Sequence, residues 1–151
     1  MNLSSQPNAT MTKFGYPESL ICDYRRWVVL LRPHQTTLGA LVLVCKDPVE
    51  AFGDISAEAF AELQEVTGDI EAGLGAFRPY QKINYLMLMM VDKHVHFHVI
   101  PRYASERQAT GVTFVDRHWP KPPLITDSQD LSDDQLQALT ELLRGAWSGG
   151  G

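Results

Sequence analysis

The sequence has few of the features that mark secreted, membrane-spanning or nucleic-acid-binding chains. Only two cysteines, Cys22 and Cys45, occur in 151 residues, and they lack CxxC spacing. We therefore expect no disulfide framework and predict a cytoplasmic location. No apolar run approaches the ~20 residues of a membrane span, and the first residues lack a signal-peptide core. The net charge of −5 argues against general binding of polymeric nucleic acid, so a phosphate site must be local.

What the sequence does contain is a row of histidines. His94, His96 and His98 alternate with the large apolar residues Val95 and Phe97. Strict alternation predicts a half-buried strand whose successive side chains point to opposite faces. Three of the five histidines of the chain therefore share one face of one strand.

Such a row can act as a nucleophile or as part of a metal site. A neutral imidazole nitrogen can attack phosphorus if the other ring nitrogen donates its proton to a fixed acceptor. We assign the attack to the middle histidine, His96, with a backbone carbonyl as that acceptor. His98 would bind the phosphoryl group or assist the leaving group, and His94 would fix the row. Alternatively, two of the histidines bind a metal ion with a distant third ligand such as His118 or Asp116.

The remaining patterns predict the secondary structure around this row. Apolar runs predict strands at 27–31, 40–45 and 83–91, with a short further strand at 112–115. Helical spacing of apolar residues predicts a long helix over 57–73, ended by Gly73 and Gly75, and a second helix after Ser132. Asp92 and Lys93 are typical of a two-residue turn leading into the histidine strand.

The domain organisation follows from length and composition. Residues 1–12 are polar and are expected to form a flexible arm. Residues 13–147 should form a single domain with one core, because the length suits one domain and no linker is evident. Residues 148–151 are expected to be a flexible tail.

The His-x-His-x-His pattern with apolar x, followed by Pro101 and Arg102, resembles the histidine triad (HIT) family. Within it, the chain resembles the hydrolase branches that act on diadenosine polyphosphates or nucleoside phosphoramidates. The resemblance implies an α+β fold, an antiparallel sheet of about five strands with one long helix across it, and a homodimer. It also implies a nucleotidyl hydrolase or transferase that acts on an α-phosphate through a covalent nucleotidyl-histidine. The partner would be a small nucleotide, with no membrane and no required cofactor, although Mg²⁺ can accompany a polyphosphate.

The chain departs from the family pattern at its nucleotide-binding positions. Ala40 stands where many members carry a further histidine, and Leu31 and Arg32 stand near the end of the first strand, where relatives often place an Asp or Asn for the ribose hydroxyls. The usual Gly-rich phosphate loop before the triad is also absent. The candidates for the missing nucleotide contacts are Asn84, Arg32, Lys93 and Arg102. The missing loop leaves a further hypothesis open, a nucleotide-binding module without turnover.

Overall fold

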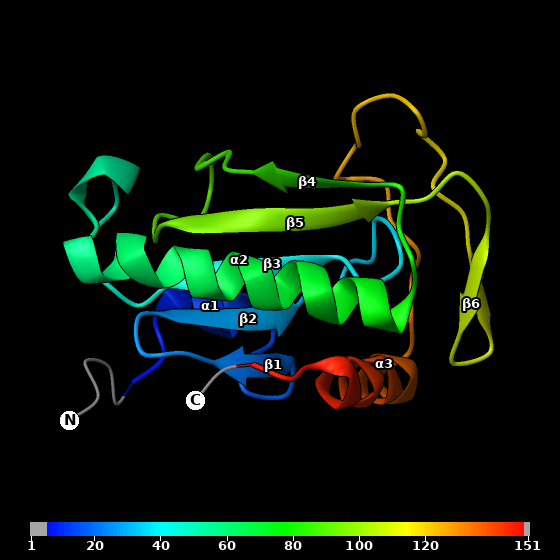
Figure 1. The fold of residues 1–151 in the computed structure, drawn as a ribbon, viewed down its shortest axis with the longest axis horizontal. Helices are drawn as coiled ribbons and strands as arrows, with labels where there is room; N and C mark the ends of the chain where they lie inside the picture. The colour runs from blue at the N-terminus through cyan, green and yellow to red at the C-terminus, as the bar shows by residue number, and fades with distance from the viewer. Residues whose placement is uncertain (1–5, 150–151) are drawn as a thin grey trace.

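The computed structural model describes residues 6–149 and shows an α+β fold (Figure 1). The first five residues of the expected arm and the last two of the expected tail lie outside this range. The elements in chain order are α1 (Ala9–Lys13), β1 (Leu20–Asp23), β2 (Trp27–Leu31), β3 (Leu41–Cys45), the 3-10 turn η1 (Phe52–Asp54), α2 (Ala57–Phe77), β4 (Lys82–Leu86), β5 (His96–Arg102), β6 (Arg107–Ala109), β7 (Val112–Phe114) and α3 (Asp133–Ala146). Among the described residues, no helix is long and apolar enough to cross a membrane.

The main sheet has five antiparallel strands in the order β1-β2-β3-β5-β4, which confirms the predicted fold class. Strand β5 lies between β3 and β4, so the histidine strand is inside the sheet. Its register places His96 opposite Val44 and His98 opposite Val42. Strands β6 and β7 form a separate hairpin.

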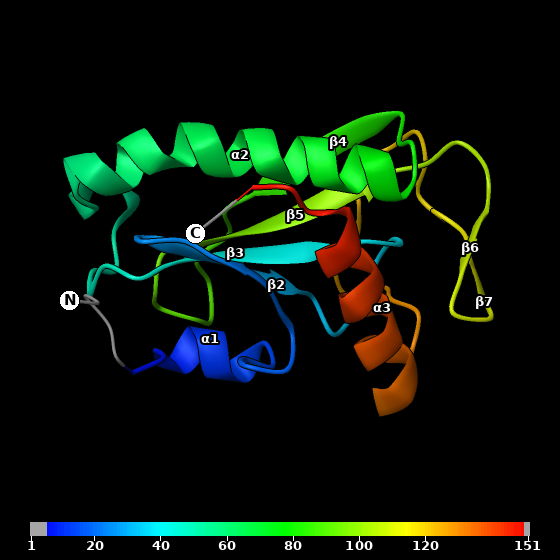
Figure 2. The ribbon, with the colours of Figure 1, turned by 60° about the horizontal axis from the view of Figure 1, so that its bottom comes forward.

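The two faces of the sheet are covered by different helices. Figure 2 shows α2 on one side of the sheet and α1 on the other. The α2 side carries the larger core, to which Val95 and Val99 belong. On the α1 side, residues of β2 and β3 pack against Met11 and Phe14. The histidines lie on this second side, because paired residues of neighbouring strands point to the same face.

Helix α2 begins as predicted but does not end at the glycines. Ser56 caps it by accepting a hydrogen bond from the Ala59 N–H at 3.1 Å, as serine does at many helix N-termini. The helix continues past Gly73 and Gly75 to Phe77. A Cβ at Gly73 would lie 2.5 Å from Cε3 of Trp147. The glycine therefore allows close packing of the Trp147 ring, which explains its presence inside a helix.

The connection into the histidine strand differs most from its prediction. Strand β4 ends at Leu86 and β5 begins at His96, so residues 87–95 form a nine-residue loop instead of strand, turn and strand. Met89 has a left-handed backbone conformation, with φ of 53°. Met90 and Val91 are about four-fifths exposed, at 83% and 82%. The apolar run 83–91 was expected to be a strand throughout, but its last residues form a loop in which Leu88, Met90 and Val91 are exposed.

The expected flexible arm also contains ordered structure. Residues 9–13 form α1, whose N-cap Asn8 accepts a hydrogen bond from the Met11 N–H at 2.9 Å. Met11 and Phe14 are buried because their side chains cover the sheet face. The arm prediction is therefore wrong for residues 9–12, and this short helix becomes part of the site described next.

Candidate functional site

The ring orientation of His96 is fixed by its own strand. Its Nδ1 lies 2.6 Å from the backbone carbonyl oxygen of His94. A carbonyl oxygen can only accept, so Nδ1 carries the proton and donates it to this bond. The lone pair of neutral His96 is then on Nε2, which has no hydrogen bond among residues 6–149. This is the arrangement required of an attacking imidazole.

His98 lies beside His96 and is held as a neutral ring. The two ring centroids are 5.3 Å apart, and the His98 side chain is deeply buried. Burial, and after it the positive charge of Arg32, lower the pKa of His98 to about 4. Its Nδ1 is buried and lacks a hydrogen-bond partner within the described part of the chain. Neutral His98 can therefore offer one N–H to a bound group, and one of its nitrogens is unsatisfied.

His94 precedes β5 and contacts the N-terminal helix. Its Nδ1 lies 3.0 Å from the hydroxyl oxygen of Thr10 in α1. Burial, and then the charge of Lys93, lower the pKa of His94. The ring thus joins the loop 87–95 to α1, while its carbonyl orients His96. This fits a positioning role for His94.

The N-terminal helix forms a wall over the histidine row that the sequence analysis did not foresee. The ring of Phe14 lies 6.1 Å from the His96 ring and 5.7 Å from the His98 ring, between centroids. Lys13 pairs with Asp92 of the loop at 2.9 Å. The available signal was Asn8 as a helix cap, followed by apolar residues three positions apart.

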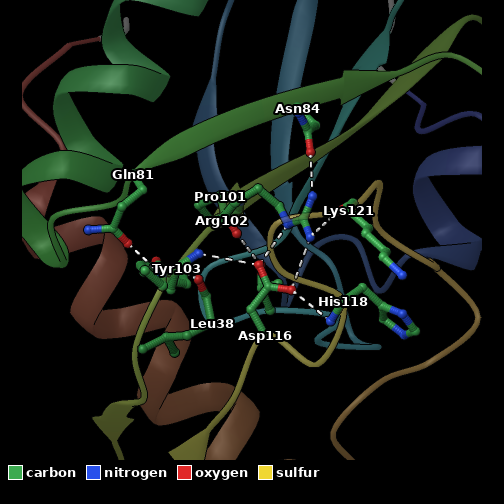
Figure 3. A network of polar contacts seen from close by, with 11 residues as sticks. Leu38, Gln81, Asn84, Pro101, Arg102, Tyr103, Asp116, His118 and Lys121 are labelled. Atoms are coloured by element: carbon green, nitrogen blue, oxygen red, sulfur yellow. Dashed lines mark hydrogen bonds and ion pairs between the residues drawn. The ribbon is translucent and has the colours of Figure 1, made fainter.

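Two of the four candidate nucleotide contacts are engaged within the protein. Figure 3 shows Arg102 at the centre of a polar network at the end of β5. Its Nε donates to Oδ2 of Asp116 at 2.7 Å, and its Nη1 donates to Oδ1 of Asn84 at 2.9 Å. A third bond reaches the Lys121 carbonyl at 2.7 Å. Arg102 and Asn84 therefore hold the chain that follows β7 against the sheet.

The same network occupies the residues considered as distant metal ligands. Both Asp116 oxygens accept hydrogen bonds from Arg102. His118 lies 2.9 Å from Asp127 through Nε2. The structure therefore does not bring Asp116 or His118 to the triad as a third ligand. Within residues 6–149, no group of three His, Cys, Asp or Glu side chains is arranged to hold a metal ion.

The other two candidates, Arg32 and Lys93, lie in different surroundings. Arg32 follows β2 and is 7% exposed. Lys93 is exposed in the loop 87–95. Of the four, Arg32 is the buried cation whose charge acts on His98.

Comparisons with known proteins bear on the fold. No protein-family model matches the chain, and no curated protein matches it. Solved structures do match. A histidine triad protein from Sinorhizobium meliloti aligns with a TM-score of 0.73 at 17% identity, over 97% of this chain and 99% of its own. A histidine triad protein from Bradyrhizobium japonicum aligns at 0.71 and 17%, over 95% and 98%.

A third match is a hypothetical histidine triad nucleotide-binding protein from Sulfolobus tokodaii. It aligns with a TM-score of 0.64 at 16% identity, over 85% of this chain and 82% of its own. These identities are low, so the likeness concerns the fold. With its histidine strand inside a five-stranded antiparallel sheet, the chain has the fold of the histidine triad proteins.

Proposed function

We propose that the protein is a nucleotidyl hydrolase or transferase that forms a covalent nucleotidyl-histidine on His96. The observation that supports this most directly is the 2.6 Å contact between His96 Nδ1 and the His94 carbonyl. It fixes the proton on Nδ1 and leaves the Nε2 lone pair for attack on an α-phosphorus. The substrate would be a dinucleoside polyphosphate or a nucleoside phosphoramidate.

The proposed reaction has two steps, attack by His96 and hydrolysis of the nucleotidyl-histidine. The Nε2–P bond forms as the bond from phosphorus to the leaving oxygen or nitrogen breaks, and the leaving group takes a proton from water. Water then attacks the nucleotidyl-histidine, and nucleoside monophosphate and free His96 are produced. His98 is neutral near pH 7 because its pKa is about 4, so its role would be to donate its single N–H to one phosphate oxygen of the substrate.

The partners in this proposal are small. The similar structure from Sulfolobus tokodaii is that of a hypothetical nucleotide-binding protein, which supports a nucleotide ligand here. We also propose a homodimer, as the resemblance to the family implies. No cofactor takes part in the step, although Mg²⁺ can accompany a polyphosphate substrate.

A trapping experiment tests the proposal. The protein is mixed with an adenosine phosphoramidate or a diadenosine polyphosphate, quenched rapidly and examined by mass spectrometry. We expect an adenylyl adduct on His96 that is absent from His96→Ala and present in His34→Ala, which removes an exposed histidine. Full turnover by His96→Ala would refute the assignment.

A nucleotide-binding module without turnover is the second candidate, and one observation favours it. His96 and His98 are only 3% and 6% exposed beneath α1, which limits access to the nucleophile. If the protein binds nucleotide but yields neither adduct nor product, this second function replaces the first. Turnover that depends on added zinc would instead support a metal-dependent enzyme that uses two of the histidines.

A further inference from the structure

Arg32 is a buried cation without a counter-charge. Its Nη1 donates to the His34 carbonyl at 2.7 Å and to the Thr36 hydroxyl at 3.0 Å. Its Nε is buried with no acceptor, and no carboxylate of residues 6–149 forms an ion pair with it. Burial lowers the pKa of Arg32. An unpaired buried charge is costly, so an anionic ligand would stabilise this group.

Arg102 gives the contrast within the same sheet. It is similarly buried, at 3% exposure, but it pairs with Asp116 through two nitrogens. The chain therefore supplies a carboxylate to one buried arginine of the triad side and none to the other. Arg32 donates to a carbonyl and a hydroxyl but has no carboxylate partner among the described residues.

His98 is the second unsatisfied group, and it lies on the same face of the sheet. In the sheet register Leu30 pairs with Val42, and Val42 pairs with His98. Arg32 lies two residues beyond Leu30, hence on the same face and one row of side chains further on. The Arg32 N–H donates to the Ala40 carbonyl at 2.9 Å, which places Ala40 next to it on the intervening strand.

The strand between the two groups carries small and medium side chains on this face. Ala40 puts only a methyl group above β3 beside Arg32, and Val42 lies on the same face beside His98. After burial, the charge of Arg32 is the largest contribution to the lowered pKa of His98. Two buried nitrogens without partners in the described chain, Nε of Arg32 and Nδ1 of His98, thus belong to residues on the same face of the sheet in adjacent rows.

We propose that Arg32 and His98 form a subsite for a second phosphate group of the substrate, one row of side chains beyond His98 from His96. This proposal rests on the proposed function, because the first phosphate is the one that His96 attacks. A phosphate has oxygens enough to accept from both groups, and the planar guanidinium is suited to it. In dinucleotide-binding sheets, an arginine near the ribose accommodates a ribose phosphate where an acidic residue binds the free hydroxyl. The second phosphate is therefore either on the ribose or in the chain that leaves.

Binding measurements test this without requiring turnover. The probes are AMP, ADP, adenosine 2′,5′-bisphosphate and adenosine 3′,5′-bisphosphate, titrated calorimetrically into the full chain. We expect at least one doubly phosphorylated probe to bind about tenfold tighter than AMP or more, the size of one charge-assisted hydrogen bond. A gain with either bisphosphate places the second phosphate on the ribose, and a gain with ADP alone places it in the leaving chain.

Two variants show which residue causes the gain. Arg32→Met should remove the preference for the second phosphate and leave AMP binding nearly unchanged. Arg25→Met makes the same charge change at an exposed position and should keep the preference. If Arg32→Met does not fold, Arg32→Lys serves instead, since it keeps the charge but loses the planar fork and should show a reduced preference.

A second readout follows His98 directly. In NMR spectra, the His98 ring nitrogens should shift when the preferred doubly phosphorylated probe is added and shift less with AMP. The subsite is refuted if wild-type protein binds AMP as tightly as every other probe, or if Arg32→Met weakens all probes equally. Failure of the His96 adduct with the binding preference intact would reject the proposed catalysis and leave the subsite standing.

Discussion

Acidification should destabilise the protein through His98. The folded pKa of about 4 lies below the ~6.5 of a histidine in an unfolded chain. Between these values the unfolded chain binds more protons, so the free energy of unfolding falls as the pH falls through that window. The stabilisation is fully present above about pH 6.5 and is lost by about pH 4. From pH 7 to pH 5, linkage gives a loss of about 2 kcal/mol from this one group.

The assay is urea unfolding at both pH values, with His98→Gln as the test variant. Glutamine does not titrate, so the variant should lose about 2 kcal/mol less than wild type over the same interval. His34→Gln, which removes an exposed imidazole, shows what the loss of a histidine does by itself. If wild type and His98→Gln lose the same stability, His98 does not have the depressed pKa and the reasoning is wrong.

Two further predictions concern packing and buried charge. Gly73→Ala should reduce the free energy of unfolding by about 1–3 kcal/mol, because its Cβ would overlap the Trp147 ring; in a Trp147→Leu background this cost should largely disappear in urea unfolding. Asp116→Ala should lower the free energy of unfolding by about 3–5 kcal/mol, because it leaves the buried Arg102 without its carboxylate partner. Arg117→Ala, which removes an exposed ion pair, should lower it by less than about 1 kcal/mol in the same measurement. Equal costs for these two variants would contradict the burial argument.

The sheet could be predicted because its strands are patterned strongly and locally. The continuous apolar runs at 27–31 and 40–45 became β2 and β3, both fully buried. The alternating histidine stretch became β5, with valines to the core and histidines to the other face. Composition and periodicity were sufficient here, since both faces of these strands have a covering layer.

The loop before the triad could not be predicted in the same way. The run 83–91 is almost entirely apolar, and an apolar run alone does not distinguish a buried strand from an exposed loop. The left-handed Met89 and the exposed Met90 and Val91 depend on tertiary context. The site is affected directly, because this loop carries His94 and its carbonyl.

The helix α1 and the lack of a carboxylate partner for Arg32 could not be predicted from the sequence, for a different reason. Each depends on contacts between residues far apart in the chain. Thr10 reaches His94 across 84 positions, and Arg32 is notable only because no acid was placed beside it. Patterns of neighbouring residues do not indicate such pairings, so the sequence suggested Arg32 and Arg102 equally as nucleotide contacts. The structure distinguishes them, because only Arg102 has a carboxylate partner among the described residues.

The position of α1 has a consequence for the order in which the site is assembled. Strands β2 and β3 are adjacent in the chain and pair with little loss of chain entropy. The histidines are covered only when residues 8–14 contact residues 92–98. This contact requires closure of a loop of about 80 residues. Contacts of such long range form late and open early. The histidine face should therefore be the first part of the sheet exposed to solvent under mild denaturation, and the last to be covered on refolding.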